Sequence, residues 1–438
     1  MSTKVTGIYD ARKELGWGKT IIMGLQQCFA MFGATILVPV LTNSYPGAEG
    51  MGLSASVTLF CAGIATLWFH FITKGKVPVF LGSSFAFLGM YGAIIPAYGK
   101  EYATGGVIAA GGLYVILAIL IKVFGTKRVM KLFPPVVCGP LIILIGINLA
   151  GSAVSNVMTN WILGVIPIIV ILICNTWGKG MIKIIPVLIA LIVSYIIAIV
   201  MGAVNFDAVG TAAWVGLPTF HLPKFNADCI IAGLAVAVAA MVEHVGDVMA
   251  IGATCGKNFI ADPGLTRTLL GDGIGTSLAG LLGGPANTTY GENTGVLALS
   301  KIYDPLVIRI AAVLAIILSF SPKFEAVINT IPTGIIGGIS FVLYGMISAI
   351  GVRNVVENRV DFTNSRNLIV AAVILVCALG FNSVGGVGFT VGSVTINLSG
   401  LAVAAIAGIL LNAILPGNDY EFDATAGSDA ATSGNLQV

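Results

Sequence analysis

GPANTTYGEN, residues 284–293, is a polar decapeptide inside a chain that is otherwise strongly apolar. The 438 residues are 57% hydrophobic and only 9% charged, and their mean hydropathy is +0.99. Soluble domains carry about 25% charged residues. The decapeptide nevertheless contains Glu292, and ionisable side chains inside membrane spans are costly and tend to mark functional pathways. We therefore expect a polytopic membrane protein organised around this stretch.

Apolar runs follow one another almost from end to end of the chain. A transmembrane helix needs about 20 predominantly apolar residues, and the connections are too short to hold a soluble domain. The pattern predicts an all-α polytopic membrane protein with fourteen spans. These spans are expected at 17–41, 52–73, 77–98, 104–125, 130–152, 159–177, 180–202, 229–253, 266–283, 284–300, 305–321, 323–351, 365–384 and 397–415.

Basic residues are unevenly divided between the two sides of the membrane that this count defines. Nineteen of the 22 Lys and Arg residues fall on the side of the N-terminus, and the other side receives Lys100, Lys224 and Lys323. Loops rich in Lys and Arg stay in the cytoplasm. Both ends are therefore expected to be cytoplasmic: the segment 1–16 and an acidic tail, 416–438, whose composition is typical of disorder.

The longest loop, 205–228, divides the chain into two halves of seven spans. Halves with an odd number of spans lie in opposite orientations, which indicates a 7+7 inverted repeat. The third span of each half, VPVFLGSSFAFLG at 77–89 and GPANTTYGENTGV at 284–296, is interrupted by Gly and Pro. Paired interrupted segments point to a binding site between inverted repeats. In each we expect a short β-like piece followed by a half-helix whose N–H groups face a common point.

Four acidic residues fall inside predicted spans: Glu243, Asp247, Asp272 and Glu292. Glu243 and Asp247 are four residues apart and so share one face of span eight. Glu243 and Glu292 are candidates to accept N–H donors from a small polar ligand. Burial disfavours the charged form of a carboxyl, so Glu243, Asp247 and Asp272 are candidates to carry a proton. For Asp272 a helix-packing or capping role is the alternative.

Other chemistries find no support in the residue pattern. The seven cysteines are scattered singly, without CxxC spacing, and no His, Cys or carboxylate cluster has metal-ligand spacing. No nucleophile and base constellation of an enzyme is found. His244 adjoins Glu243 but points about 100° away round the helix, which favours packing over a proton relay. We expect no cofactor, no metal and no nucleic acid partner.

Five stretches resemble the nucleobase–ascorbate transporter family, and most closely its bacterial uracil permeases. The resemblance covers about residues 15–415, and SSFAF and NTTYGEN are its most specific motifs. The five stretches are QQCFAMFGATILVPV (26–40), KGKVPVFLGSSFAF (74–87), EHVGD (243–247), NTTYGEN (287–293) and SFVLYGMI (340–347).

The resemblance implies a core domain at 17–125 and 229–321, and a gate domain at 130–202 and 323–415, with 205–228 as an extracellular loop. It also implies proton-coupled uracil symport across the cell membrane by alternating access. Movement of core against gate in a homodimer would carry the substrate. The implied partners are uracil or a related nucleobase, protons and the lipid bilayer.

Motif by motif, the resemblance also implies a ligand site. Glu243 and Glu292 would accept the ring N–H groups, and the backbone N–H groups of Phe85 and Gly291 would donate to carbonyl oxygens. Tyr344 would lie on the gate side, and Phe85 and Tyr290 would contact the flat ring. The candidate ligand-binding residues are Glu243, Glu292, Phe85, Gly291, Tyr290 and Tyr344.

Two departures from the uracil pattern leave the substrate open. Asp247 stands where that pattern has His, and purine carriers of the family have an acid at this position. Gln27 also stands where the pattern has His. Glu292 favours uracil, because the purine carriers have Gln there. A xanthine or purine symporter of the same fold is the alternative, and an anion exchanger is a weaker one because two fixed carboxylates would repel an anion.

Overall fold

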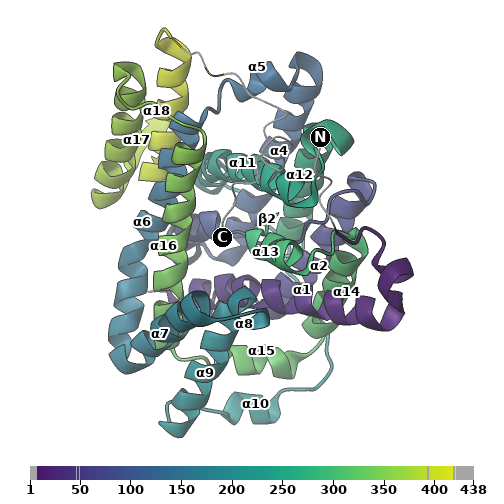
Figure 1. The fold of residues 1–438 in the computed structure, drawn as a ribbon. Coiled ribbons are helices and arrows are strands. Elements are labelled where there is room, and N and C mark those ends of the chain that lie inside the picture. The colour runs from purple at the N-terminus through teal and green to yellow at the C-terminus, as the bar shows by residue number, and fades with distance from the viewer. Residues whose placement is uncertain (1–6, 46, 49, 392–393, 418–419, 421–438) are drawn as a thin grey trace.

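The computed structural model describes residues 7–45, 47–48, 50–391, 394–417 and 420, and these form a largely helical chain (Figure 1). Most of the predicted tail 416–438, and 1–6 of the N-terminal segment, lie outside the described residues. In chain order the elements are α1 (Ala11–Ser44), α2 (Ala55–Ile72), β1 (Leu81–Ser83), η1 (Phe85–Phe87), α3 (Leu88–Tyr98), α4 (Lys100–Phe124), α5 (Thr126–Met130), α6 (Pro135–Thr159), α7 (Trp161–Trp177), α8 (Met181–Ile184), α9 (Pro186–Val200), α10 (Asp207–Thr211), α11 (Ala227–Cys255), η2 (Ile260–Gly264), α12 (Leu265–Leu281), β2 (Asn287–Thr289), α13 (Gly291–Ser300), α14 (Pro305–Ser319), α15 (Pro322–Asn329), α16 (Thr333–Glu357), α17 (Ser365–Ser383), β3 (Val387–Val391), β4 (Val394–Leu398) and α18 (Gly400–Ile414).

Several helices are suited to crossing a membrane. Among the described residues, seven are long and apolar enough, namely α1, α2, α4, α6, α11, α16 and α17, and α14 with α15 would make an eighth. Each of the fourteen predicted segments contains a helix, but apolar helices such as α7 and α9 have only 17 and 15 residues. The count of fourteen spans therefore stays a prediction.

The twelfth predicted span, 323–351, differs from the structure at its start. Helix α15 is a separate element bent by 85° from α14, and α16 begins only at Thr333. Pro332 explains the break, because proline has no N–H to continue the hydrogen-bond ladder of α15 and biases the residue before it away from helix. The short helix α15 is thus a connector between α14 and α16.

Strands β3 and β4 form an antiparallel hairpin in a place where no strand is predicted, so the all-α prediction is wrong at Val387–Leu398. The sequence carries a hairpin signal there: two runs rich in β-branched residues flank the dipeptide Gly392–Ser393. That signal is weak within a hydrophobic chain, where such runs equally suit a span.

The first two strands come from the interrupted segments and pair with each other. Strand β1 runs antiparallel to β2 with Gly82 opposite Thr288, and all residues of both strands are buried. Two further backbone bonds extend the pair: Ser84 N donates to Ala286 O at 2.8 Å, and Tyr290 N donates to Phe80 O at 3.0 Å. Backbone at membrane depth must satisfy its polar groups internally, and here each interruption satisfies the other.

The helices pack in two groups. In one, α12 packs on α4 and α2, α14 packs on α2 and α1, and α11 packs on α4. In the other, α16 packs on α6 and α7, α7 packs on α9, and α17 packs on α6 and α18. Figure 1 shows the second group along one flank of the molecule, with α6, α16 and α17 close together. Three further helices contact this second group. Helix α1 contacts α9 and α16, α3 contacts α6, and α11 contacts α6 and α18.

Replacing Gly82 by Ala should destabilise the strand pair, because a Cβ at this position would meet the ring carbons of Tyr290. Overpacking a buried site costs about 1–3 kcal/mol. Gly89→Ala, where a Cβ would have no neighbour within 4 Å, is the matched control. Thermal unfolding in detergent should give a lower midpoint for Gly82→Ala alone. Equal midpoints for both variants would contradict the close approach.

Candidate functional site

Two half-helices begin at opposite ends of the β1–β2 pair. Element η1 starts at Phe85 after β1, and α13 starts at Gly291 after β2. In neither case does the preceding residue cap the helix with its side chain. The first N–H groups of a helix have no intrahelical acceptor and carry partial positive charge. The strand pair therefore leads into two groups of free backbone N–H donors, one at the helix start that follows each strand.

The acids of span eight lie against these helix starts. Helix α11 packs on η1, β2 and α13, and it carries Glu243 and Asp247, both partly buried. The carboxyl of Glu243 is within electrostatic range of Asp247, Glu292 and Asp272. Glu292 itself lies in the first turn of α13. The structure thus brings together the four acids that the sequence places inside spans, from three different elements.

Asp247 is held by the second strand. The Thr289 hydroxyl donates to the Asp247 carboxylate at 2.5 Å. Because Thr289 is 2% exposed and belongs to β2, this bond ties α11 directly to the interrupted segment. Hydrogen bonds to charged groups are stronger than those between neutral groups. Asp247 is therefore an element of the strand–helix junction as well as a member of the acidic cluster.

Tyr290 points into the strand pair. Its hydroxyl donates to Ser83 O at 3.0 Å, and its ring lies against Gly82, where the missing Cβ makes room for it. Thr35 Oγ1 reaches the same hydroxyl at 3.4 Å. With 3% of its surface exposed, the Tyr290 side chain is committed to holding the two strands and α1 together.

Asp272 and His244 face each other in the protein interior. His244 Nδ1 lies 2.9 Å from Asp272 Oδ2, and both side chains are fully buried. The ring N–H is not well aligned with the oxygen, since neither side chain completes a hydrogen bond of normal geometry. The rings of Phe69 and Tyr114 meet the imidazole edge-on. This contact joins α11 to α12.

Asn293 makes a contact that sequence reasoning missed. Its amide donates to Gln27 Oε1 at 2.8 Å and to Gln27 O at 3.0 Å. The bonds tie the first turn of α13 to α1. Both residues lie in motif stretches, but no local pattern relates two residues that are 266 positions apart. A polar residue in each of two apolar spans was the available signal.

Phe85 and Tyr344 are the remaining predicted ligand-binding residues, and they lie on different elements. Phe85 is partly buried at the start of η1. Tyr344, on α16, is 1% exposed, and its hydroxyl completes no hydrogen bond of normal geometry although Ser340 and Ser152 are near. It is within electrostatic range of Tyr45, which donates to Leu88 O on α3 at 3.1 Å. An unsatisfied buried hydroxyl is costly, which makes Tyr344 a candidate donor to a ligand.

A cavity of about 220 Å³ reaches the site from one side. Glu292 and Leu343 line it, with further walls from α1 and from the α8–α9 segment. Among the described residues no three His, Cys, Asp or Glu side chains are arranged to hold a metal ion. The site can therefore be described as a pair of carboxylates and two helix N-termini, with an open approach beside Glu292.

Solved structures with a similar fold include two transmembrane proteins of low sequence identity. The transmembrane domain of the cyanobacterial bicarbonate transporter BicA aligns with a TM-score of 0.62 at 17% identity, covering 93% of this chain and all of that domain. SLC26A9 aligns with a TM-score of 0.66 at 11% identity, covering 93% of this chain and 66% of the other. At such low identity the likeness concerns the fold alone.

Curated relatives are more similar in sequence. The chain is 40% identical to the uracil permease of Bacillus caldolyticus, covering 94% of this chain and 95% of the relative. It is 39% identical to the uracil permease of Bacillus subtilis (strain 168), with the same coverage. It is also 39% identical to the putative pyrimidine permease RutG of Escherichia coli (strain K12), covering 94% and 92%. A model of the permease family matches residues 18–385. The chain therefore belongs to the permease family and is a multi-pass membrane protein.

Proposed function

We propose that the protein is a proton-coupled symporter of uracil in the cell membrane. The observation that carries this proposal is the convergence of Glu243 and Glu292 on two helix N-termini that no side chain caps. Two relatives at 39–40% identity are named uracil permeases, which favours uracil among small polar ligands.

The hydrogen-bonding pattern of uracil complements this site. Uracil has two ring N–H donors and two carbonyl acceptors, and it carries no charge at neutral pH. Glu243 and Glu292 supply acceptors, while the backbone N–H groups of Phe85 and Gly291 supply donors. Phe85 contacts the flat ring, and Tyr344 closes the site from α16. Tyr290 serves the site by fixing the strand pair, since its side chain is engaged there.

The proposed coupling ion is a proton. Charged groups buried together are costly unless they are neutralised, and a proton neutralises a carboxylate without needing further ligands. Asp247 and Glu243 are the proposed carriers because they share one face of α11 beside the ligand site. Asp272 is the third candidate, and it lies 2.9 Å from the imidazole of His244.

Alternating access would move the two packing groups as core and gate domains. Their boundaries would be 17–125 with 229–321, and 130–202 with 323–415. The packing supports this division, since most helix contacts fall within one group or the other. We further propose fourteen spans as an inverted repeat, both termini in the cytoplasm, and a homodimer as the working assembly.

A purine symporter is the second candidate. It is favoured by one observation, the carboxylate of Asp247 within electrostatic range of Glu292, where the uracil pattern has His. Anion exchange is disfavoured because Glu243 and Glu292 would repel an anion.

A thermal-shift panel separates these candidates. A ligand that binds only the native state raises the unfolding temperature. At equal concentrations uracil should raise it, and xanthine, adenine and sulfate should not. A shift with xanthine but none with uracil would establish the purine alternative instead.

Glu292→Gln should replace the charged acceptor that Glu292 offers to a ring N–H group by a neutral amide oxygen. Hydrogen bonds to charged groups contribute about 1.5–3 kcal/mol, so the affinity for uracil should fall about 10- to 100-fold. Initial uptake of labelled uracil into proteoliposomes, driven by an inward proton gradient, measures the loss. Glu357→Gln, which changes an exposed glutamate paired with Arg353, is the control and should behave as wild type. Wild-type uptake that ignores the proton gradient would overturn the coupling.

Thr289→Val should weaken the junction of β2 with α11, because it removes the hydroxyl that donates to Asp247. Leaving a buried carboxylate without a partner costs about 1–3 kcal/mol. Thr289→Ser keeps the hydroxyl and is the matched control. Thermal unfolding in detergent should separate the valine variant from the serine variant. Identical midpoints would mean that this bond contributes nothing to the fold.

A further inference from the structure

The cavity beside Glu292 has an unusual distribution of polar groups. We call this cavity of about 220 Å³ the vestibule. Three of its lining residues have polar side chains, Asn175, Lys183 and Glu292, and the rest are apolar or glycine. Glu292 is partly buried at the ligand site, whereas Asn175 and Lys183 are exposed. The vestibule therefore has an acid at its inner end and a cation with an amide at its outer end.

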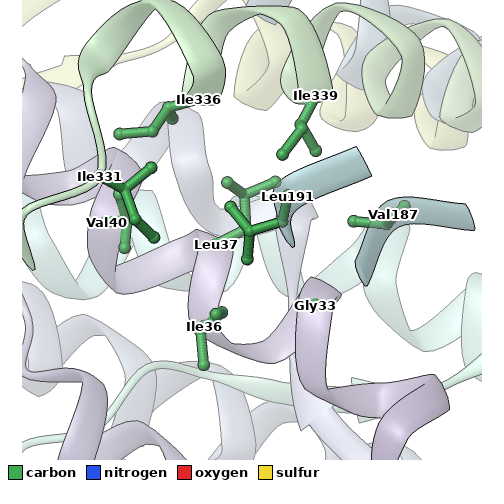
Figure 2. A pocket seen from close by; sticks show the side chains of 9 residues that line it. All are labelled: Gly33, Ile36, Leu37, Val40, Val187, Leu191, Ile331, Ile336 and Ile339. Atoms are coloured by element: carbon green, nitrogen blue, oxygen red, sulfur yellow. The ribbon is translucent and has the colours of Figure 1, made fainter. Parts of the chain in front are cut away.

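The vestibule opens to one side. On α1 it is lined by residues 29, 30, 33 and 34, and on α13 it extends from Glu292 to Leu299, a distance of about 10 Å along the helix. Beyond Gly33, α1 lines an apolar seam, a small cavity of about 10 Å³ whose lining side chains Figure 2 shows. In that seam Ile36, Leu37 and Val40 meet residues of α9 and α16, and no lining residue is polar. A polar solute can thus reach Glu292 along α13 but not through the seam.

The walls of the vestibule come from both packing groups. Helices α1 and α13 form one wall, and Lys183, Val187 and Met346, from α8, α9 and α16, belong to the other. A volume of about 220 Å³ is many times that needed for one water molecule. Cavities with apolar walls and a few directed polar groups are typical of binding sites for small molecules.

We propose that the vestibule is a second, transient binding site for the transported nucleobase, with Lys183 and Asn175 as its recognition residues. This inference rests on the proposed function. The Lys183 ammonium and the Asn175 amide N–H donate to ring carbonyl oxygens, and the Asn175 amide oxygen accepts a ring N–H. A neutral base can then pass from these groups to Glu292 without leaving its own polar atoms unpaired.

The charges suit a neutral ligand rather than an ion. Lys183 at the outer end attracts anions, but Glu292 at the inner end repels them. A cation is repelled by Lys183 at the outer end and attracted by Glu292 at the inner end. A neutral ring with separated donors and acceptors is favoured at both ends. Lys183 is thereby a specificity-determining residue on one side of the membrane only.

The test compares two lysines of the same short segment. Lys183 lines the vestibule, whereas Lys179 is exposed nearby and does not line it. Uptake of labelled uracil is measured in right-side-out and inside-out membrane vesicles containing the wild type, Lys183→Met, Lys183→Arg or Lys179→Met. Reaction of a Lys183→Cys variant with a membrane-impermeant maleimide identifies the face on which the vestibule opens.

We expect Lys183→Met to raise the KM about tenfold at the labelled face, as for the loss of one hydrogen bond to a charged donor, and less than twofold at the opposite face. Lys183→Arg keeps a cationic donor and should retain most of the wild-type KM. Lys179→Met should match the wild type at both faces. Asn175→Ala should raise the KM at the labelled face alone.

Three results would overturn the inference. Equal changes at both faces would place the effect in the central site. Equal effects of Lys179→Met and Lys183→Met would mean that both lysines only anchor the membrane surface. If Lys183→Met has wild-type kinetics at the labelled face, the transient site does not exist, while the proposed function still stands. A wild-type protein that takes up no nucleobase in either orientation would instead overturn the proposed function itself.

Discussion

The pairing of β1 with β2 is the interaction on which the rest of the structure depends. Inside a membrane, a stretch of extended backbone has no water to satisfy its N–H and C=O groups, and each unsatisfied group is costly. Neither Leu81–Ser83 nor Asn287–Thr289 could exist alone at that depth. Paired, they satisfy each other and leave two helix starts facing the acids of α11. The same pairing requires Gly82, because the Tyr290 ring occupies the space of a side chain.

The acidic residues differ in what their carboxylates contact. Asp272 faces His244 in a fully buried contact, and Asp247 accepts a bond from Thr289. Glu292 borders a cavity. Acids whose oxygens are engaged within the protein stabilise a fixed arrangement of α11, α12 and β2. Glu292, which borders open space, keeps its carboxylate accessible to the proposed ligand.

Much of the site could be predicted from the sequence because its determinants are local. Proline and glycine mark the two interruptions, and the spacing of Glu243 and Asp247 puts both on one helix face. The direction of His244, away from Glu243, also follows from helix geometry. The bond between Asn293 and Gln27 could not be predicted, because it depends on how two remote helices pack. The role of Tyr290 likewise depends on the space beside Gly82. The two β-branched runs that form β3 and β4 gave only a weak signal, because such runs suit a span equally well.

The strand pair also has a consequence for how the protein is made. About two hundred residues separate Ser83 from Asn287, and ribosomes deliver the chain to the membrane from the N-terminus at about 5–20 residues per second. The first strand therefore enters the bilayer long before its partner exists. Until the second strand arrives, the polar backbone of Leu81–Ser83 must be shielded by water, by the insertion machinery or by a temporary helical conformation. Contacts between residues so distant in sequence form late, so the ligand site is completed only when most of the protein is already in the membrane.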